Sequence, residues 1–190
     1  VKTPEEIEKI RAACAVVRDT FAYLGRHIAA GMTTKEVDTL VHDYIVQSGA
    51  TPSSLGYCGF PGSACVSVNE VVVHGIPGDR VLKDGDIVSV DVTAEKDGYN
   101  GDACRTYCIG NVSPARRKLV RVTEECFFKG IEGLKAGTPL FDIGYRVQSH
   151  AEANGFGVVR SFVGHGIGRD MHEDLSLIHI SEPTRLDVMA

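Results

Sequence analysis

The sequence predicts an α+β protein made of two related halves, each with two helices followed by antiparallel strands. Two long segments with apolar residues at helical spacing come first, and a pair of alternating strands then meets at Asp97-Gly98. A second pair of helical segments follows, in which Phe127 matches Phe21 and Val147 matches Val41 at one offset of 106. A constant offset of this kind indicates a duplicated unit.

The composition is that of an ordinary globular protein. With 190 residues, 43% of them hydrophobic, the chain is long enough for one domain with its own core. A net charge of -5 argues against a nucleic-acid-binding surface. No apolar run approaches the length of a membrane span, and the first residues show no signal-peptide pattern. We therefore expect a cytoplasmic protein without membrane contact, whose six cysteines remain thiols.

Two helices are predicted at the start of the first half. Thr3 and Glu6 form a capping box with Pro4 at the first helical position, so the first helix begins there. The segment 30–33 ends this helix and caps the next one, which stops at Gly49. The apolar stripe of the first helix consists of Ile7, Ile10, Cys14, Val17, Phe21 and Leu24. The stripe of the second consists of Val37, Leu40, Val41, Tyr44 and Ile45.

Loops and short strands are predicted between the helices and the hairpin. A loop rich in Ser, Gly and Pro covers 51–62 and carries Tyr57 and Phe60. Residues 64–68 alternate as a strand, and the apolar run 71–77 predicts a further short strand that contains a histidine. Both strands lead toward the hairpin around which the rest of the chain is organised.

Residues 87–109 are predicted to form this hairpin, because Asp-Gly is a strong signal for a two-residue turn. Counting outward from the turn places Thr93 opposite Asp102 and makes Asp91 a diagonal neighbour of Asp102 on one face. Such neighbours lie roughly 7–8 Å apart at Cα, and their carboxylates repel one another unless a cation lies between them. Two interpretations remain open at this point: a pair of divalent metal ions between the acids, or a polar sheet face with two solvated carboxylates.

The second half repeats the helical pattern. One helix is predicted to begin at Ser113-Pro114, and another begins within 136–139 and ends at Gly155. Their apolar positions are Leu119, Val122, Cys126 and Phe127 in the first and Ile143, Val147 and Ala151 in the second. The tripeptide His-Gly-Ile at 74–76 recurs at 165–167, which supports the duplication.

Five motifs occur in order along the chain: Val73–Pro77, Asp84–Val92, Gly98–Asp102, Gly164–Gly168 and Met171–Glu173. Together they resemble the motifs of type I methionine aminopeptidases, a family with the duplicated pita-bread fold that prolidase and creatinase share. The resemblance covers residues 1–174 and implies a single domain. Its first half would span 1–112, and an incomplete second half would span 113–174.

The resemblance implies a dinuclear metal site with five protein ligands, of which Asp91, Asp102 and His165 supply three. The two divalent ions would be Co, Mn, Fe or Zn, since carboxylates and an imidazole suit all four. His74 and His172 match histidines that contact the substrate and act in catalysis, although a lone histidine at a strand end is more often structural. The positions that match the walls of the methionine pocket are Tyr57, Phe60, Cys65 and Met171.

The implied activity is that of a metal-dependent aminopeptidase that removes the initiator methionine from nascent proteins. Its partners would be peptide N-termini that begin with methionine and also the ribosome, and the enzyme would be a monomer. The alternatives are an X-Pro aminopeptidase or prolidase and a non-catalytic pita-bread binding module. The run Tyr57–Pro61 favours the methionine enzyme, and the presence of Asp91, Asp102 and His165 argues against the non-catalytic module.

The family pattern stops after Asp174. The next residues, Leu175–Arg185, resemble the translation of a common sequencing-library adapter, so we expect 175–190 to be a non-native tail. The two remaining ligands of the family are glutamates beyond this point. Glu182 precedes a proline as one of them does, but it lies too close in sequence to His172 to take that position. We therefore expect the chain as written to be unstable and inactive, because a sheet edge, apolar surface and two metal ligands are left without their partners.

Overall fold

The structure is a computed structural model that describes residues 1–160, 162 and 164–174. The chain divides into two compact units. The first unit comprises residues 1–113 together with 167–173, and the second contains residues 114–166 and Asp174. Within the described residues, no helix is both long and apolar enough to cross a membrane.

Both helices of the first unit begin at the predicted caps. Helix α1 spans Pro4–Leu24 and helix α2 spans Thr34–Gln47. The hydroxyl of Thr3 accepts a hydrogen bond from the Glu6 amide, and the Glu6 carboxylate accepts one from the Thr3 amide. The second helix has the same reciprocal pair at its start. These bonds satisfy amides that have no partner in the first helical turn, which fixes where each helix starts.

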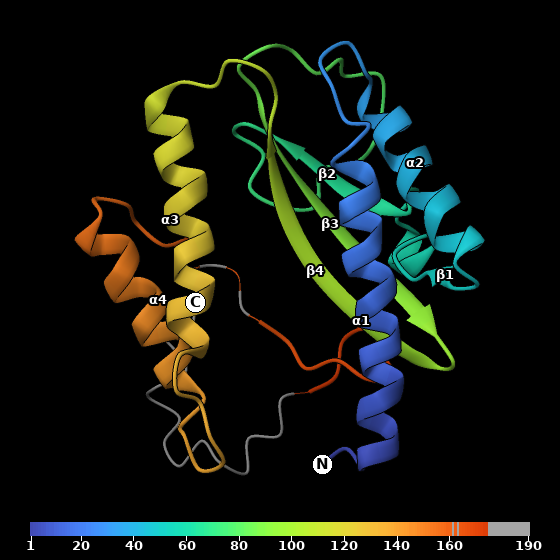
Figure 1. The fold of residues 1–190 in the computed structure, drawn as a ribbon, viewed down its shortest axis with the longest axis vertical. Coiled ribbons are helices and arrows are strands. Elements are labelled where there is room, and N and C mark those ends of the chain that lie inside the picture. Colours follow the sequence, from blue (N-terminus) through green and yellow to red (C-terminus); the bar gives the residue numbers. More distant parts are fainter. Residues whose placement is uncertain (161, 163, 175–190) are drawn as a thin grey trace. The chain divides into compact units, whose positions relative to one another are not determined.

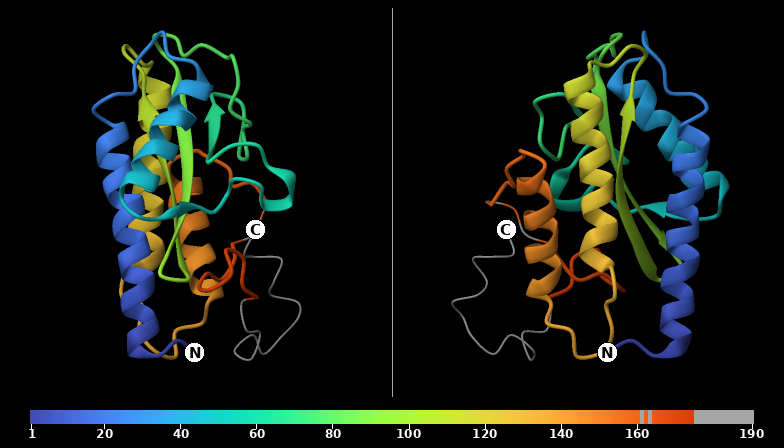
Figure 2. Two further views of the ribbon diagram at one scale, coloured as in Figure 1. Left: turned by 90° about the vertical axis from the view of Figure 1, so that its right-hand side faces the viewer. Right: turned by 60° about the vertical axis from the view of Figure 1, so that its left-hand side comes forward.

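The buried side of α1 agrees with the predicted stripe only in the second half of the helix. Its buried residues are Ala13, Val16, Val17, Thr20, Phe21 and Leu24. Ile7, in contrast, is 45% exposed, and Cys14 is exposed as well. The first turns of α1 extend past the end of the hairpin in every view (Figures 1 and 2). Helical spacing therefore identifies the apolar side of this helix but not the length of its contact with the sheet.

The sheet of the first unit is antiparallel and has β3 at its centre. Its strands are β1 (Thr51–Pro52), β2 (Ala64–Val68), β3 (Ile87–Lys96) and β4 (Tyr99–Cys108). Strand β4 pairs along all of β3, so β1 and β2 share the other edge of β3. Lys96 pairs with Tyr99 and Thr93 pairs with Asp102. The predicted hairpin and its register are therefore confirmed.

One face of this sheet forms the core. Val88, Val90, Val92 and Ala94 alternate along β3 and are all 0% exposed. They pack with the apolar sides of α1 and α2, which lie together against the same face of the sheet (Figures 1 and 2). Burial of one face fixes the register, because a slip of one residue would expose the entire valine series. The alternate positions of β3 consequently point to the opposite, more polar face.

The segment 71–77 is not a strand, so this prediction was wrong. His74 has a φ of 57°, which takes the chain out of the extended region and prevents a regular ladder. The segment is held beside β2 by two hydrogen bonds, from the Val66 amide to the Gly75 carbonyl (2.8 Å) and from the Gly75 amide to Ser67 Oγ (3.0 Å). A Cβ on Gly75 would lie 2.3 Å from the Val66 carbonyl oxygen, so this close approach requires glycine.

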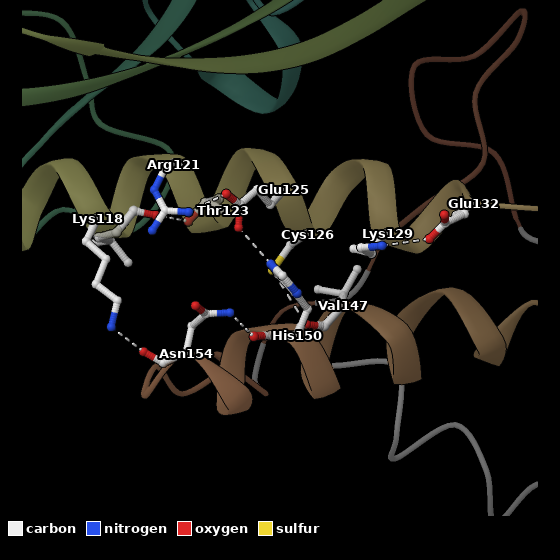
Figure 3. A network of polar contacts seen from close by, with 11 residues as sticks. Lys118, Arg121, Thr123, Glu125, Cys126, Lys129, Glu132, Val147, His150 and Asn154 are labelled. Carbon is white, nitrogen blue, oxygen red and sulfur yellow. Dashed lines mark hydrogen bonds and ion pairs between the residues drawn. The ribbon is translucent and has the colours of Figure 1, made fainter.

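The second unit is a pair of helices, α3 (Pro114–Ile131) and α4 (Phe141–Ala153). Its small apolar cluster consists of Val122, Cys126 and Ala151 with Val147, Phe156 and Val158 packed around them. Polar contacts join the same helices: His150 Nε2 lies 2.9 Å from a Glu125 carboxylate oxygen, and Lys118 Nζ donates to the Asn154 carbonyl at 2.7 Å (Figure 3). The helix pair is thus held by a short apolar seam flanked by polar contacts.

Two details of this unit differ from the sequence prediction. Phe127 and Leu119 were expected on the apolar side of α3, but they are 61% and 37% exposed. Helix α4 begins at Phe141 and not within 136–139. At its start the Asp142 amide donates to the Pro139 carbonyl and the Ile143 amide donates to the Leu140 carbonyl, which is the i to i+3 pattern of a 3-10 turn. No side chain caps its N-terminus, and without the glutamate of a capping box the sequence signal for this start was weaker.

Candidate functional site

The two acids of the hairpin lie on the polar face of the sheet. Asp91 in β3 pairs with Cys65 in β2 on one side and with Cys104 in β4 on the other, while Asp102 pairs with Thr93. Directly paired residues of antiparallel strands share a face, so Asp91 and Asp102 are diagonal neighbours on that face. Both side chains are half-buried. The arrangement inferred from the two-residue turn is the one observed.

The carboxylates raise the pKa values of the neighbouring thiols. The pKa of Cys65 is raised to about 12, first by burial of the thiol and then by the negative charges of Asp91 and Asp102. The side chain of Cys104 is exposed, yet desolvation by the surrounding chain and then the same two carboxylates raise its pKa to about 12. The pKa of Cys14 in α1 is also raised, by burial first and by Asp102 second. The polar face therefore disfavours added negative charge and favours a cation.

Residues 167–173, called the strap below, belong to the first unit although they are distant in sequence. The Asn100 amide donates to the Gly168 carbonyl at 2.8 Å, which joins the strap to β4. Arg169 lies 3.6 Å from Glu6 and has its guanidinium 4.7 Å from the centre of the Tyr99 ring. Glu173 forms an ion pair with Lys2 at the other end of the strap. These contacts place Met171 and His172 beside the hairpin that carries the two acids.

The strap meets the loop that was predicted to line the methionine pocket. Tyr57 begins a short 3-10 turn, η1 (Tyr57–Gly59), and its hydroxyl lies 2.9 Å from His172 Nδ1. The two rings are 5.2 Å apart between centroids and tilted by 39°. The structure thus brings together two predicted site residues that are 115 positions apart. Of the other pocket positions, Cys65 is buried, and Phe60 and Met171 are half-buried.

His74 occupies an exposed position next to β2, in the left-handed conformation described above. Its neighbour Gly75 bonds to Val66 and Ser67, the two residues that follow Cys65 in the strand. A positive φ is uncommon outside glycine, and residues held in this conformation cluster at functional sites. The bonds of Gly75 therefore hold His74 beside strand β2.

His165 belongs to the second unit, where its Nδ1 lies 2.9 Å from the Gly166 carbonyl oxygen and its side chain is exposed. Among residues 1–160, 162 and 164–174, no group of three or more His, Cys, Asp or Glu side chains is close enough to hold a metal ion. The three-ligand set of Asp91, Asp102 and His165 stays a prediction. Glu182 and the expected tail 175–190 lie outside the described residues.

Sequence reasoning missed the residues that hold the strap. No sequence motif relates Asn100 to Arg169, and Asn100 and Gly168 are 68 positions apart. The available signal was a polar side chain two residues before Asp102, on the same face of the hairpin as the two acids. A polar side chain is buried only where it has hydrogen-bond partners, and the alternation of the strand does not identify these partners.

Comparisons with known proteins agree with this geometry. Residues 8–188 match the model of metallopeptidase family M24. Methionine aminopeptidase 1 of Bacillus subtilis is 48% identical over 184 residues, covering 97% of this chain and 74% of the relative. The crystal structure of methionine aminopeptidase from Rickettsia prowazekii superposes with a TM-score of 0.89 at 42% identity and covers 92% of this chain and 70% of that one.

A relative of the alternative class is similar in fold but less so in sequence. The solved Xaa-Pro dipeptidase from Bacillus anthracis has a TM-score of 0.82 at 26% identity, covering 93% of this chain and 49% of its own. The pita-bread architecture is therefore common to both classes, whereas the sequence similarity is greater to the two methionine aminopeptidases. This chain belongs to metallopeptidase family M24, as a metalloexopeptidase of the methionine aminopeptidase type.

Proposed function

We propose that Asp91, Asp102 and His165 hold two divalent metal ions, of Co, Mn, Fe or Zn. The observation that carries the proposal is the placement of both carboxylates on one sheet face, where they raise the pKa of Cys65. Two carboxylates and an imidazole are a donor set that these metals accept, so the residues present fit the group. When bound, a metal pair supplies an activated water and polarises the carbonyl of the bond to be cleaved.

The substrate class that we propose is a peptide with methionine at its N-terminus, such as a nascent protein that still carries its initiator methionine. The relatives are named for this activity. Tyr57, Phe60, Cys65 and Met171 form the proposed pocket, since aromatic rings and sulfur atoms are soft, polarizable walls for a thioether. The buried thiol of Cys65 is kept uncharged by its raised pKa of about 12, which suits an apolar side chain beside it.

We assign to the two histidines the contacts with the peptide backbone. His172 would donate a hydrogen bond from Nε2 to the carbonyl oxygen of the cleaved bond, since its Nδ1 is engaged by Tyr57. His74 would contact the substrate from its position beside β2. We also propose that the protein is a cytoplasmic monomer that meets its substrate at the ribosome.

The test combines this chain with a relative. Residues 1–174 are joined to the corresponding C-terminal segment of the Bacillus subtilis protein, and methionine release from Met-Ala-Ser is measured as Mn or Co is titrated. We expect release by the chimera, none by the chain with residues 175–190 as written, and none after Asp102→Asn. The matched control is Asp97→Asn, an exposed acid in the turn of the same hairpin.

Each other outcome has a defined meaning. Cleavage of Ala-Pro peptides in preference to Met-Ala-Ser would assign the chain to the X-Pro class. Failure of the chimera on both peptides at saturating metal, with an intact fold, would support a non-catalytic module. Methionine release by the chain as written would contradict the proposal that residues 175–190 are a non-native tail.

A further inference from the structure

A buried amide connects the two segments whose side chains meet at the proposed substrate site. Asn100 in β4 is 4% exposed. Its Nδ2 donates to the carbonyl oxygens of Gly168 (3.2 Å) and Arg169 (3.0 Å) in the strap. Its Oδ1 accepts a hydrogen bond from Ser53 Oγ at 2.6 Å, in the loop that leads to Tyr57.

We propose that Asn100 is a positioning residue that holds the strap and the 53–60 loop together, so that His172 rests against Tyr57. The inference rests on the proposed role of His172 at the substrate. Ser53 lies shortly before Tyr57, and the two strap carbonyls lie shortly before His172, so one side chain fixes both segments near their functional residues. At the far ends of these segments, Tyr57 Oη and His172 Nδ1 lie 2.9 Å apart.

The chemistry of the amide explains why asparagine is suited to this position. The strap offers only carbonyl oxygens, which need N–H donors, while Ser53 offers a hydroxyl that needs an acceptor. An amide supplies both from one short side chain, whereas aspartate supplies acceptors alone and would repel the carbonyl oxygens. Because these groups are buried, an unpaired one carries the full cost of desolvation.

Two kinds of contact remain when the Asn100 side chain is replaced. One is the backbone bond from the Asn100 amide to the Gly168 carbonyl (2.8 Å), and the others lie nearer the surface, beyond Gly168. The carboxylate of Glu6 meets the guanidinium of Arg169, whose side chain is 67% exposed, and Lys2 meets Glu173. Ion pairs that are partly in contact with water contribute little, so beyond Gly168 the buried side-chain amide is expected to dominate the position of the strap. Loss of the Nδ2 donors should leave the strap attached at Gly168 and free the part that follows, so that His172 separates from Tyr57. The hairpin, fixed by its own ladder, should remain in place.

The experiment compares Asn100→Asp and Asn100→Ala with the unmodified chain. The first readout is the nuclear Overhauser effect between the ring protons of Tyr57 and His172. The second is the rate of trypsin cleavage after Arg169, whose own carbonyl accepts from Asn100 in the native structure. We expect the ring contact to disappear in both variants and cleavage to accelerate about tenfold, the factor that corresponds to about 1.4 kcal/mol.

Two control variants separate positioning from a general loss of stability. Asn69 is a half-buried asparagine whose side chain makes two hydrogen bonds, to Asp86 and with the Ile87 amide, and neither of these bonds is to the strap. Asn69→Ala should lower the melting temperature and leave both readouts unchanged. Ser53→Ala removes only the hydroxyl that donates to Asn100 Oδ1 and leaves the bonds to the strap, so the trypsin rate should stay close to that of the unmodified chain.

The results that would overturn the proposal are equally specific. Asn100→Asp keeps the side-chain volume, so an unchanged ring contact and trypsin rate in this variant would show that the amide does not position the strap. If trypsin cleavage accelerated equally in Asn69→Ala, the effect of Asn100 would be general stabilisation and not positioning of the strap. Neither readout requires metal or turnover, so the outcome is independent of whether the chimera with His172→Ala loses methionine release.

Discussion

Replacing Gly101 with alanine tests how the acid-bearing strand is held against α1. Gly101 lies in β4 directly before Asp102, and a Cβ at this position would lie 2.5 Å from the Cys14 amide nitrogen and 2.7 Å from the Ala13 carbonyl carbon. These are backbone atoms of a helix, so they cannot move aside as a flexible side chain would. The strand must separate from α1, and overpacking of this kind costs about 1–3 kcal/mol.

The matched control is Gly78→Ala, because a Cβ on Gly78 would meet nothing within 4 Å. Without a clash, the substitution should be neutral or stabilise slightly through the unfolded state. Unfolding in urea, followed by circular dichroism, gives the free energy of unfolding of each variant. Equal stability of Gly101→Ala and Gly78→Ala would refute the close packing of α1 on β4 and the placement of Asp102 that depends on it.

Three further predictions follow from burial and charge. The pKa of Glu6 is lowered from 4.5 to about 2, chiefly by the Thr3 amide and then by the Tyr99 hydroxyl, so its stabilising effect is complete above pH 4.5 and is lost as pH falls through 2. Over this pH range the urea midpoint of Glu6→Gln should therefore change less than that of the parent. Parallel plots of urea midpoint against pH for the two proteins would contradict the assignment. Burial raises the pKa of Cys65 most and the charge of Asp91 raises it next, so in metal-free protein Asp91→Asn should speed alkylation of Cys65 at pH 9, as followed by mass spectrometry, and an unchanged rate would argue against their pairing. Val90 is fully buried, so Val90→Ala should lower the free energy of unfolding by about 2 kcal/mol in urea titrations, and a loss below about 0.5 kcal/mol would place Val90 outside the core.

The hairpin was predictable because its information is local. A two-residue Asp-Gly turn fixes the register, and the alternation of valines fixes which face is buried, so the relation of Asp91 to Asp102 follows by counting. The capping box of α1 and the cap of α2 within 30–33 are equally local and were predicted correctly. Where the signal lies within a few residues, the sequence was sufficient to predict the position of individual side chains.

The remaining features depend on partners that are distant in sequence. The valines of 71–77 favour a strand, but the left-handed His74 and the contact of Gly75 with β2 impose an irregular path. The limit of the α1 stripe depends on where the sheet ends, and helical spacing carries no such information. The bonds from Asn100 to the strap join residues 68 and 69 positions apart, so they appear only when the fold is known.

The most direct test of the shared cation site is a titration of this chain with Mn2+, followed by broadening of backbone amide signals in NMR. We predict that the amides of residues 91 and 102 broaden first and together, and that Asp91→Asn and Asp102→Asn each suppress the effect. The turn variant Asp97→Asn, which alters an exposed acid of the same hairpin, should leave it intact. Broadening that spares residues 91 and 102, or that survives both substitutions, would contradict the placement of a metal between these two carboxylates.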